Sequence, residues 1–394
     1  LIFVAHPAHS EIANYVASSS SLFAGAFFIC AVDQYLRWRQ SERARHSVLM
    51  FAAAMLSFLA KEEGIAIVPV LALLELSLPK TPKKPAFFAA LAALGAAMAG
   101  LYLGFRPHAQ NYAQPGVTVL DYFLTQIRAY VHYLQLYFWP FGMNADNLEF
   151  AFSNSVRDPR VVAAIVFQIL LAAAAWSTRS WRAGWVALLW FYAALAPTSS
   201  FVPLSEPVND RRPFIAFFAL AGLGVPLLFW VIQRLQKATP KHLARVPLLL
   251  AGILAAVFVA GSRGRSQVWS SHETLWMDTV QKNPTSGRAQ NNLALVYIGR
   301  GDWKSAAPLL EQCEMFIPRY SICKTNHAVV YAALGQEAAA EAKFKESIAL
   351  EGQGIMARKH YAGFLFRHGR LDEAEREFAR VDEVAGRYDL TGRT

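Results

Sequence analysis

Three segments in the last third of the chain share one spacing: YIGRGDWKSAAPLL at 297–310, YAALGQEAAAEAKF at 331–344 and LFRHGRLDEAEREF at 365–378. In each segment a glycine is followed by an alanine and then by a large apolar residue, and each of the three landmarks recurs every 34 residues. A period of 34 with small and aromatic landmarks is the signature of tetratricopeptide repeats, in which each repeat is a pair of helices. The C-terminal third is therefore predicted to be an all-α solenoid.

The register divides residues 285–386 into three repeats. Their bounds are 285–318, 319–352 and 353–386. A connecting segment at 262–284 is expected to hold one helix over His272–Lys282, and a short tail at 387–394 follows the repeats. Stacked repeats present a concave surface suited to binding. We therefore expect this part of the chain to recruit protein or peptide partners.

Residues 1–261 have the composition of a membrane domain. The whole chain of 394 residues is 55% apolar and 17% charged, whereas soluble domains carry about 25% charged residues. A membrane span needs roughly 20 apolar residues, and eight crossings are predicted here, some of them short. They are Val16–Leu36, Val48–Leu59, Ile65–Leu78, Ala86–Gly104, Val161–Trp176, Trp185–Ala196, Phe214–Ile232 and Val246–Gly261. The expected fold class is all-α, with a polytopic helical membrane domain followed by an α-solenoid.

Basic loops give the orientation of these crossings. Lysines and arginines gather at 37–45, 80–84, 179–182 and 234–245, and loops of this kind lie in the cytoplasm. Successive cytoplasmic loops are joined by an even number of crossings, so the aromatic segment Leu120–Trp139 is expected to lie in the outer interface or to re-enter the membrane. The same count places the repeats outside the inner membrane. The net charge of +10 (38 basic minus 28 acidic residues) follows from these loops and does not indicate nucleic acid.

The three cysteines, Cys30, Cys313 and Cys323, are too few for a disulfide scaffold. Cys313 and Cys323 could pair in an oxidising compartment. Two free thiols are the favoured interpretation from the sequence.

Three polar motifs lie on the predicted outer side. His6 to Glu11 (H-P-A-H-S-E) combines imidazoles with a carboxylate, which suits a general base or a divalent metal; the alternative is a solvated helix start. K-E-E at 61–63 puts ionisable groups at membrane depth, where they are costly and mark function; the alternative is a polar turn with an internal ion pair. D-R-R at 210–212 offers guanidinium groups for phosphate; the alternative is a charge cluster at a helix end.

Other polar groups give weaker signals. Asn144, Asp146 and Glu149 form a further polar group on the outer side, and His132 is interpreted as an interfacial residue rather than a ligand. The sequence has no phosphate-binding loop, dinucleotide fingerprint or metal-type spacing of Cys and His.

In order along the chain, these motifs resemble a known family. H-P-A-H-S-E (6–11), A-K-E-E-G-I-A-I-V-P (60–69), P-T-S-S-F-V-P-L (197–204) and D-R-R-P-F (210–214) are followed by the repeats. This arrangement resembles the transmembrane and tetratricopeptide-repeat O-mannosyltransferases and their bacterial relatives, which are GT-C glycosyltransferases. The resemblance implies an inverting enzyme that moves a sugar, mannose in the known members, from a polyprenyl-phosphate carrier to a hydroxyl group, in particular of protein Ser or Thr.

The resemblance also implies roles for individual residues. His6, Glu11 and Glu62 fall at catalytic positions, with Glu11 and Glu62 in contact with metal, sugar or acceptor. The residues expected at the lipid phosphate or substrate are Lys61, His9, Asp210, Arg211 and Arg212. A divalent metal at Glu11 and His9 stays open as an alternative.

The chain departs from the family pattern in three places. The main catalytic acid of the family lies in the first outer loop, which is expected to precede Leu1, so the chain is interpreted as N-terminally truncated. A serine run at 18–21 replaces an arginine and a neighbouring acid or small polar residue after the first motif, and D-R-R-P-F lacks a His and a Tyr of the family element. A membrane-anchored scaffold without catalysis, with repeats that assemble envelope proteins, is the alternative function.

Overall fold

The computed structural model describes residues 3–78, 84–105, 117–147, 150–177, 182–200, 203–204, 206–238, 246–350 and 355–391. Within these ranges the chain forms helices and turns and no strand. The chain divides into two compact units, Leu1–Trp269 and Ser270–Thr394. The predicted all-α class is confirmed.

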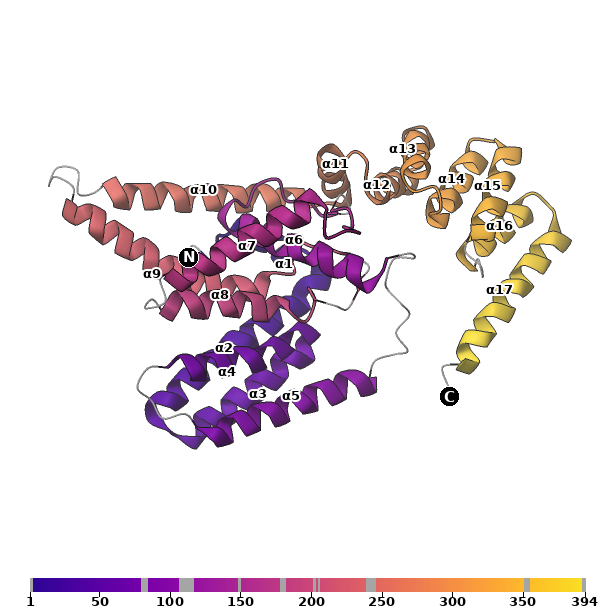
Figure 1. The fold of residues 1–394 in the computed structure, drawn as a ribbon. Coiled ribbons are helices and arrows are strands. Elements are labelled where there is room, and N and C mark those ends of the chain that lie inside the picture. The colour runs from indigo at the N-terminus through magenta and orange to yellow at the C-terminus, as the bar shows by residue number, and fades with distance from the viewer. Residues whose placement is uncertain are drawn as a thin grey trace. The chain divides into compact units, whose positions relative to one another are not determined.

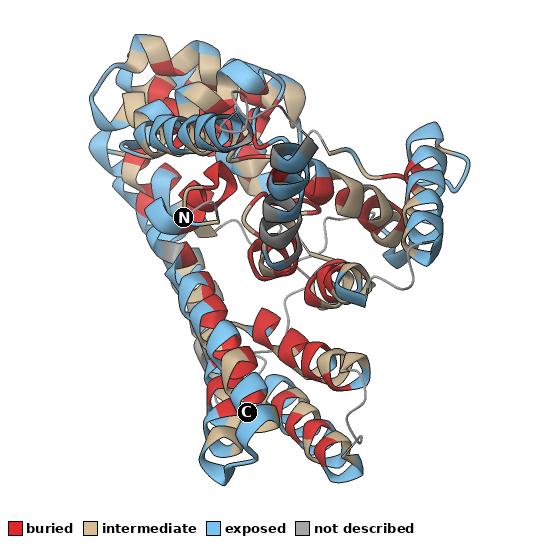
Figure 2. Cartoon of the chain, turned by 90° about the vertical axis from the view of Figure 1, so that its left-hand side faces the viewer, coloured by how far each residue is buried: buried red, intermediate tan, exposed pale blue. Residues whose placement is uncertain are grey.

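The first unit consists of helices (Figure 1). Its elements are η1 (Pro7–His9), α1 (Ser10–Asn14), η2 (Val16–Ser18), α2 (Ser19–Ser41), α3 (Ala44–Ala60), η3 (Glu62–Ala66), α4 (Ile67–Ser77), α5 (Pro85–Phe105), α6 (Val119–Phe138), α7 (Pro159–Ser177), α8 (Arg182–Leu195), α9 (Phe214–Ala238) and α10 (Val246–Val268). One apolar core holds α2 to α6, α8 and α9 together, with Phe28, Tyr35, Met50 and Phe217 almost fully buried. Buried residues occupy the helix faces that meet other helices, and exposed residues occupy the outer faces (Figure 2).

Among the residues of this unit that the structure describes, three helices are long and apolar enough to cross a membrane: Pro85–Gly104, Pro159–Ser177 and Leu248–Val268. The segment Pro7–Asn14 and the helix Ser19–Ser41 would make a fourth span, but they meet at a bend of 117°. All eight segments predicted to cross are largely helical. A crossing number of eight and the orientation of the helices stay predictions.

The helix α10 runs past the predicted domain boundary. It continues through Gly261 to Val268, and the division between the two units follows Trp269. The apolar pattern ends near Gly261, but Ser262–Val268 contains no proline, and polar residues such as Arg265 continue the helix beyond the apolar part.

The second unit is a stack of helix pairs. The lone helix α11 (His272–Lys282) has the predicted bounds. The pairs are α12 (Gly287–Gly299) with α13 (Trp303–Phe316), α14 (Ser321–Ala333) with α15 (Glu337–Leu350), and α16 (Ile355–Arg367) with α17 (Leu371–Thr391). Gly301, Gly335 and Gly369 have φ angles of 74°, 76° and 72°, a left-handed conformation that favours glycine. The glycine period therefore marks the turn within each pair.

The third repeat differs from the first two. Leu310 and Phe344 are 0% and 1% exposed, while Phe378, at the same position of the third repeat, is 40% exposed. The helix α17 also continues through Gly386, where the register predicts an end, to Thr391. Gly352 lies outside the described residues. The apolar position of α17 is exposed because no described helix follows it in the stack.

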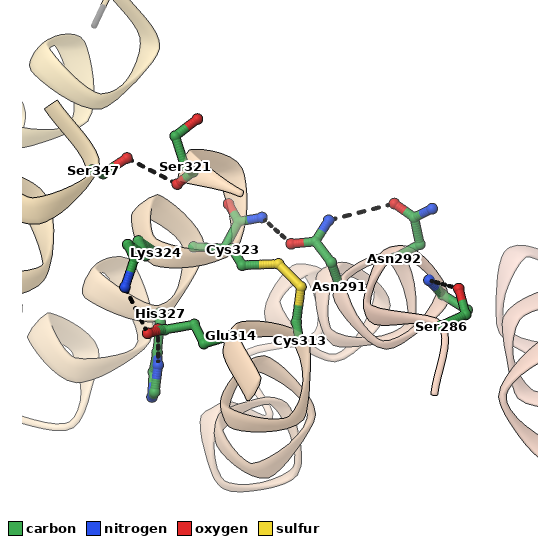
Figure 3. Close-up of a disulfide and its surroundings, with 12 residues drawn as sticks. Ser286, Asn291, Asn292, Cys313, Glu314, Ser321, Cys323, Lys324, His327 and Ser347 are labelled. Carbon is green, nitrogen blue, oxygen red and sulfur yellow. Dashed lines mark hydrogen bonds and ion pairs between the residues drawn. A yellow bond between two sulfur atoms is a disulfide. The ribbon is translucent and has the colours of Figure 1, made fainter. Parts of the chain in front are cut away.

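Cys313 and Cys323 form a disulfide, so the interpretation as free thiols is wrong (Figure 3). The end of α13 and the start of α14 pack together across a short turn, which brings the two Cα atoms to 6.2 Å, within the range that a disulfide spans. Both residues are fully buried. Cys30 is free and exposed.

Candidate functional site

The first and third polar motifs meet in the folded chain. The Arg211 guanidinium, just before α9, donates to Glu11 of α1 at 3.0 Å and lies 3.7 Å from Glu206. Arg211 also lies over the Tyr15 ring, at 5.5 Å from the ring centroid. The Glu11 side chain is 7% exposed and that of Arg211 is 29% exposed. The cation is therefore the accessible partner of this pair.

Burial dominates the electrostatics of Glu11. It raises the pKa of Glu11 to about 7, although the charge of Arg211 acts in the opposite direction. Asp210 raises the pKa further, and Arg265 at the end of α10 lowers it. A carboxyl group in this state changes charge near neutral pH.

Arg212 holds the loop that precedes α9. Its guanidinium donates to the carbonyl oxygens of Pro207 and Glu206, both at 2.8 Å, and the residue is 9% exposed. Burial lowers the pKa of Arg212, but Tyr133, Tyr122, Glu63 and Glu206 more than offset it, so the pKa is raised. Of the two arginines assigned to phosphate, Arg212 is thus engaged within the fold, and Arg211 is partly exposed.

The K-E-E motif comes near the same loop. Lys61, at the end of α3, donates to Glu63 at 2.8 Å and to Ser21 of α2 at 3.0 Å. Glu63 is buried, and its negative charge raises the pKa of Arg212. Glu62, to which the family resemblance assigned a catalytic role, is exposed and has no polar partner among the described residues. Glu63 is thus the acid that sequence reasoning missed, because adjacent acids give no signal of which one points inward.

Asp210 has three hydrogen-bond donors. His132 of α6 and the Asn147 side chain approach the same carboxylate oxygen at 2.9 and 2.8 Å, and the Asn144 backbone N–H lies 3.3 Å from the other. Asp210 is 4% exposed. The polar group predicted at Asn144, Asp146 and Glu149 therefore joins the site through Asn144, and Glu149 lies outside the described residues. His132 belongs to the site, although its sequence context favoured an interfacial role.

His6 is used within the fold. Its Nε2 lies 2.8 Å from the Tyr137 carbonyl oxygen, its Nδ1 accepts from the Ala8 N–H at 3.3 Å, and its ring stacks on that of Tyr137. Burial lowers the pKa of His6. The ring is neutral in this state, and neither nitrogen is free for a substrate.

His9 lies among aromatic rings. Its ring centroid is 4.3 Å from that of Phe3 and 5.1 Å from that of Phe214. Burial, and secondarily His6, lower the pKa of His9 to about 3, and neither ring nitrogen has a hydrogen-bond partner among the described residues. No three His, Cys, Asp or Glu side chains in the described ranges come together as a metal site. A metal at Glu11 and His9 thus lacks a third such ligand there.

Comparisons with known proteins add little to this geometry. No family model and no curated protein matches the chain. Among solved structures, the crystal structure of MamA is similar at 18% identity, with a TM-score of 0.28, over 40% of this chain and 87% of that one. A likeness at this level carries no functional argument.

Proposed function

We propose that the chain is part of a membrane glycosyltransferase that moves a sugar from a polyprenyl-phosphate carrier to a hydroxyl group of an acceptor. The observation that carries the proposal is the Glu11–Arg211 pair, because it joins motifs 200 positions apart. Glu63 interacts electrostatically with Arg212, and Lys61 donates a hydrogen bond to Glu63. Cations held beside carboxylates are suited to a leaving phosphate and a reacting hydroxyl.

Arg211 is the proposed phosphate ligand. It is partly exposed, and Glu11 and Glu206 hold its guanidinium. A planar guanidinium contacts two phosphate oxygens at once, so a lipid phosphate would bind on its open side. Arg212 and Lys61 then support the site without binding the phosphate themselves, since they already donate hydrogen bonds to protein oxygens.

The repeats have a separate proposed role, which is to recruit the protein or peptide acceptor. They form a compact unit of their own with exposed helix faces, and helical solenoids bind partners along such faces. The proposed location is a cell membrane with the repeats on its outer side. The Cys313–Cys323 disulfide supports this side, because disulfides persist in oxidising compartments.

The test is sugar release from polyprenyl-phosphate donors by the full-length protein in nanodiscs. We expect turnover in the wild type and a large loss in Arg211→Gln. The matched control is Arg37→Gln, which breaks an exposed ion pair with Asp33 in α2 and should leave turnover unchanged. No turnover with any donor, in a folded protein that still binds partners through its repeats, would favour the non-catalytic scaffold.

A further inference from the structure

His132 and Asp210 form a hydrogen-bonded pair that the proposed function leaves without a role. The His132 Nε2 atom lies 2.9 Å from Asp210 Oδ1. Asp210 is buried and has two further donors, so it acts only as an acceptor here. The hydrogen bond therefore fixes the proton of the neutral imidazole on Nε2.

The other nitrogen of the ring carries the free lone pair. His132 Nδ1 has no hydrogen-bond partner among the described residues, and 29% of the side chain is exposed. The rings of Tyr133 and Phe150 flank the imidazole edge-on, each at 5.7 Å between centroids. An imidazole held by a buried carboxylate, with its second nitrogen open, is the arrangement that general-base chemistry uses.

The other candidate bases of the site fit this task less well. Glu11 is 7% exposed and bonded to Arg211, and both nitrogens of His6 are bonded within the fold. Glu62 is exposed, but no described residue orients it. His132 alone combines an oriented ring with an open acceptor atom among these groups.

Among the described residues, charged groups of two elements lie near His132. Asp210 faces it from the loop before α9, and Arg128 lies one turn earlier on α6, with its guanidinium 4.4 Å from the centroid of the Phe150 ring. Glu11 interacts electrostatically with Asp210. An imidazolium formed at His132 would thus have Asp210 as its direct counter-charge.

We propose that His132 is the proton acceptor of the reaction and that Asp210 is its positioning residue. This inference rests on the proposed function. Nδ1 takes the proton of the acceptor hydroxyl as its oxygen bonds to the anomeric carbon of the sugar. The bond from that carbon to the phosphate oxygen breaks, its electron pair leaves with the lipid phosphate, and the imidazolium then passes its proton to water.

The test compares His132→Gln, Asp210→Asn and Asn147→Ala in the full-length protein in nanodiscs. A glutamine amide can still donate to Asp210, so His132→Gln keeps the anchoring bond and loses the base. We expect kcat to fall by about 10²- to 10⁴-fold, with donor binding and the melting temperature unchanged.

The other variants separate positioning from structure. Asp210→Asn should lower kcat, because an amide no longer fixes the tautomer, whereas Asn147→Ala removes a neighbouring donor and should cost far less. Carbethoxylation of His132, mapped by mass spectrometry, should stop turnover, and hydroxylamine should restore it. Wild-type-like turnover in His132→Gln overturns this inference alone. No turnover in the wild-type protein overturns the proposed function, and the inference falls with it.

Discussion

Glu11 and Arg211 lie 200 positions apart in the sequence, and their side chains meet at 3.0 Å. The pair joins the start of the chain to the loop before α9, and Asp210, next to Arg211, bonds α6 through His132. One short segment thus connects three parts of the first unit. The ion pair consequently stabilises the packing of the first unit and is also part of the proposed site.

Removal of one partner should destabilise the first unit. Arg211→Gln leaves the buried Glu11 carboxylate without its cation, and we expect a loss of about 1–3 kcal/mol, below the range for fully buried pairs since Arg211 is partly exposed. A double-mutant cycle of Arg211→Gln and Glu11→Gln, monitored by thermal unfolding in detergent, measures the coupling free energy between the two side chains. Arg37→Gln is the control, because an exposed pair contributes under about 1 kcal/mol. Equal losses of stability in Arg211→Gln and Arg37→Gln would contradict a stabilising role of the Glu11–Arg211 pair.

The stability of the first unit should depend on the protonation of Glu11. Burial raises its pKa to about 7 from an ordinary value of 4.5, so the folded state binds this proton more tightly than the unfolded state. The stabilisation that comes from the tighter proton binding of folded Glu11 is complete below pH 4.5, and it is lost as the pH rises through about 7. Melting temperatures measured across this window should fall in the wild type. The fall should be smaller in Glu11→Gln, and identical profiles would rule out Glu11 as its source.

Parts of this structure could be predicted from the sequence because they depend on local periodicity. The 34-residue spacing placed α12 to α16 and the left-handed glycines, since a turn that needs positive φ selects glycine. Apolar runs likewise placed the helices of the first unit. Periodicity failed at α17, where Phe378 keeps the repeat position but no helix among the described residues covers it.

The candidate site was only partly predictable, because its contacts are long-range. Motif order identified Glu11, Asp210 and Arg211, but not which side chains they touch. The choice of Glu62 over Glu63 depended on which way a 3-10 turn points its side chains. The disulfide depended on the packing of α13 against α14, which two cysteines ten positions apart do not reveal.

Gly64 should tolerate no side chain. A Cβ atom there would overlap the backbone of Ser57 and Phe58 at the end of α3, and backbone cannot move aside as a flexible side chain can. We expect Gly64→Ala to cost roughly 2–4 kcal/mol, as other overpacked or strained sites do, and to displace Lys61 and Glu63. Gly100→Ala in α5, where nothing lies within 4 Å, is the control. If thermal unfolding shows equal stability in the two variants, the close approach at Gly64 is absent.

The two phenylalanines at the same repeat position should respond differently to truncation. Phe344 is 1% exposed and Phe378 is 40% exposed, so Phe344→Ala should cost about 3–5 kcal/mol and Phe378→Ala about 1–2 kcal/mol. Hydrogen exchange of the peptides that cover α14–α17, in the full-length protein, measures both losses locally. A large loss at Phe378 would mean that a further segment covers α17.

The disulfide gives a test of which compartment holds the repeats. In cells, free thiols are blocked with N-ethylmaleimide during denaturing lysis, and the sample is then reduced and labelled with a heavier maleimide. Cys313 and Cys323 should take the heavy label, because they are paired in an oxidising compartment. Cys30 should take the light label, because it is free. The reverse result would place the repeats in a reducing compartment and contradict the proposed outer location.

In the purified protein, Cys313→Ser should lower the free energy of unfolding of the second unit by about 2–3 kcal/mol, as expected for a closed loop of this length.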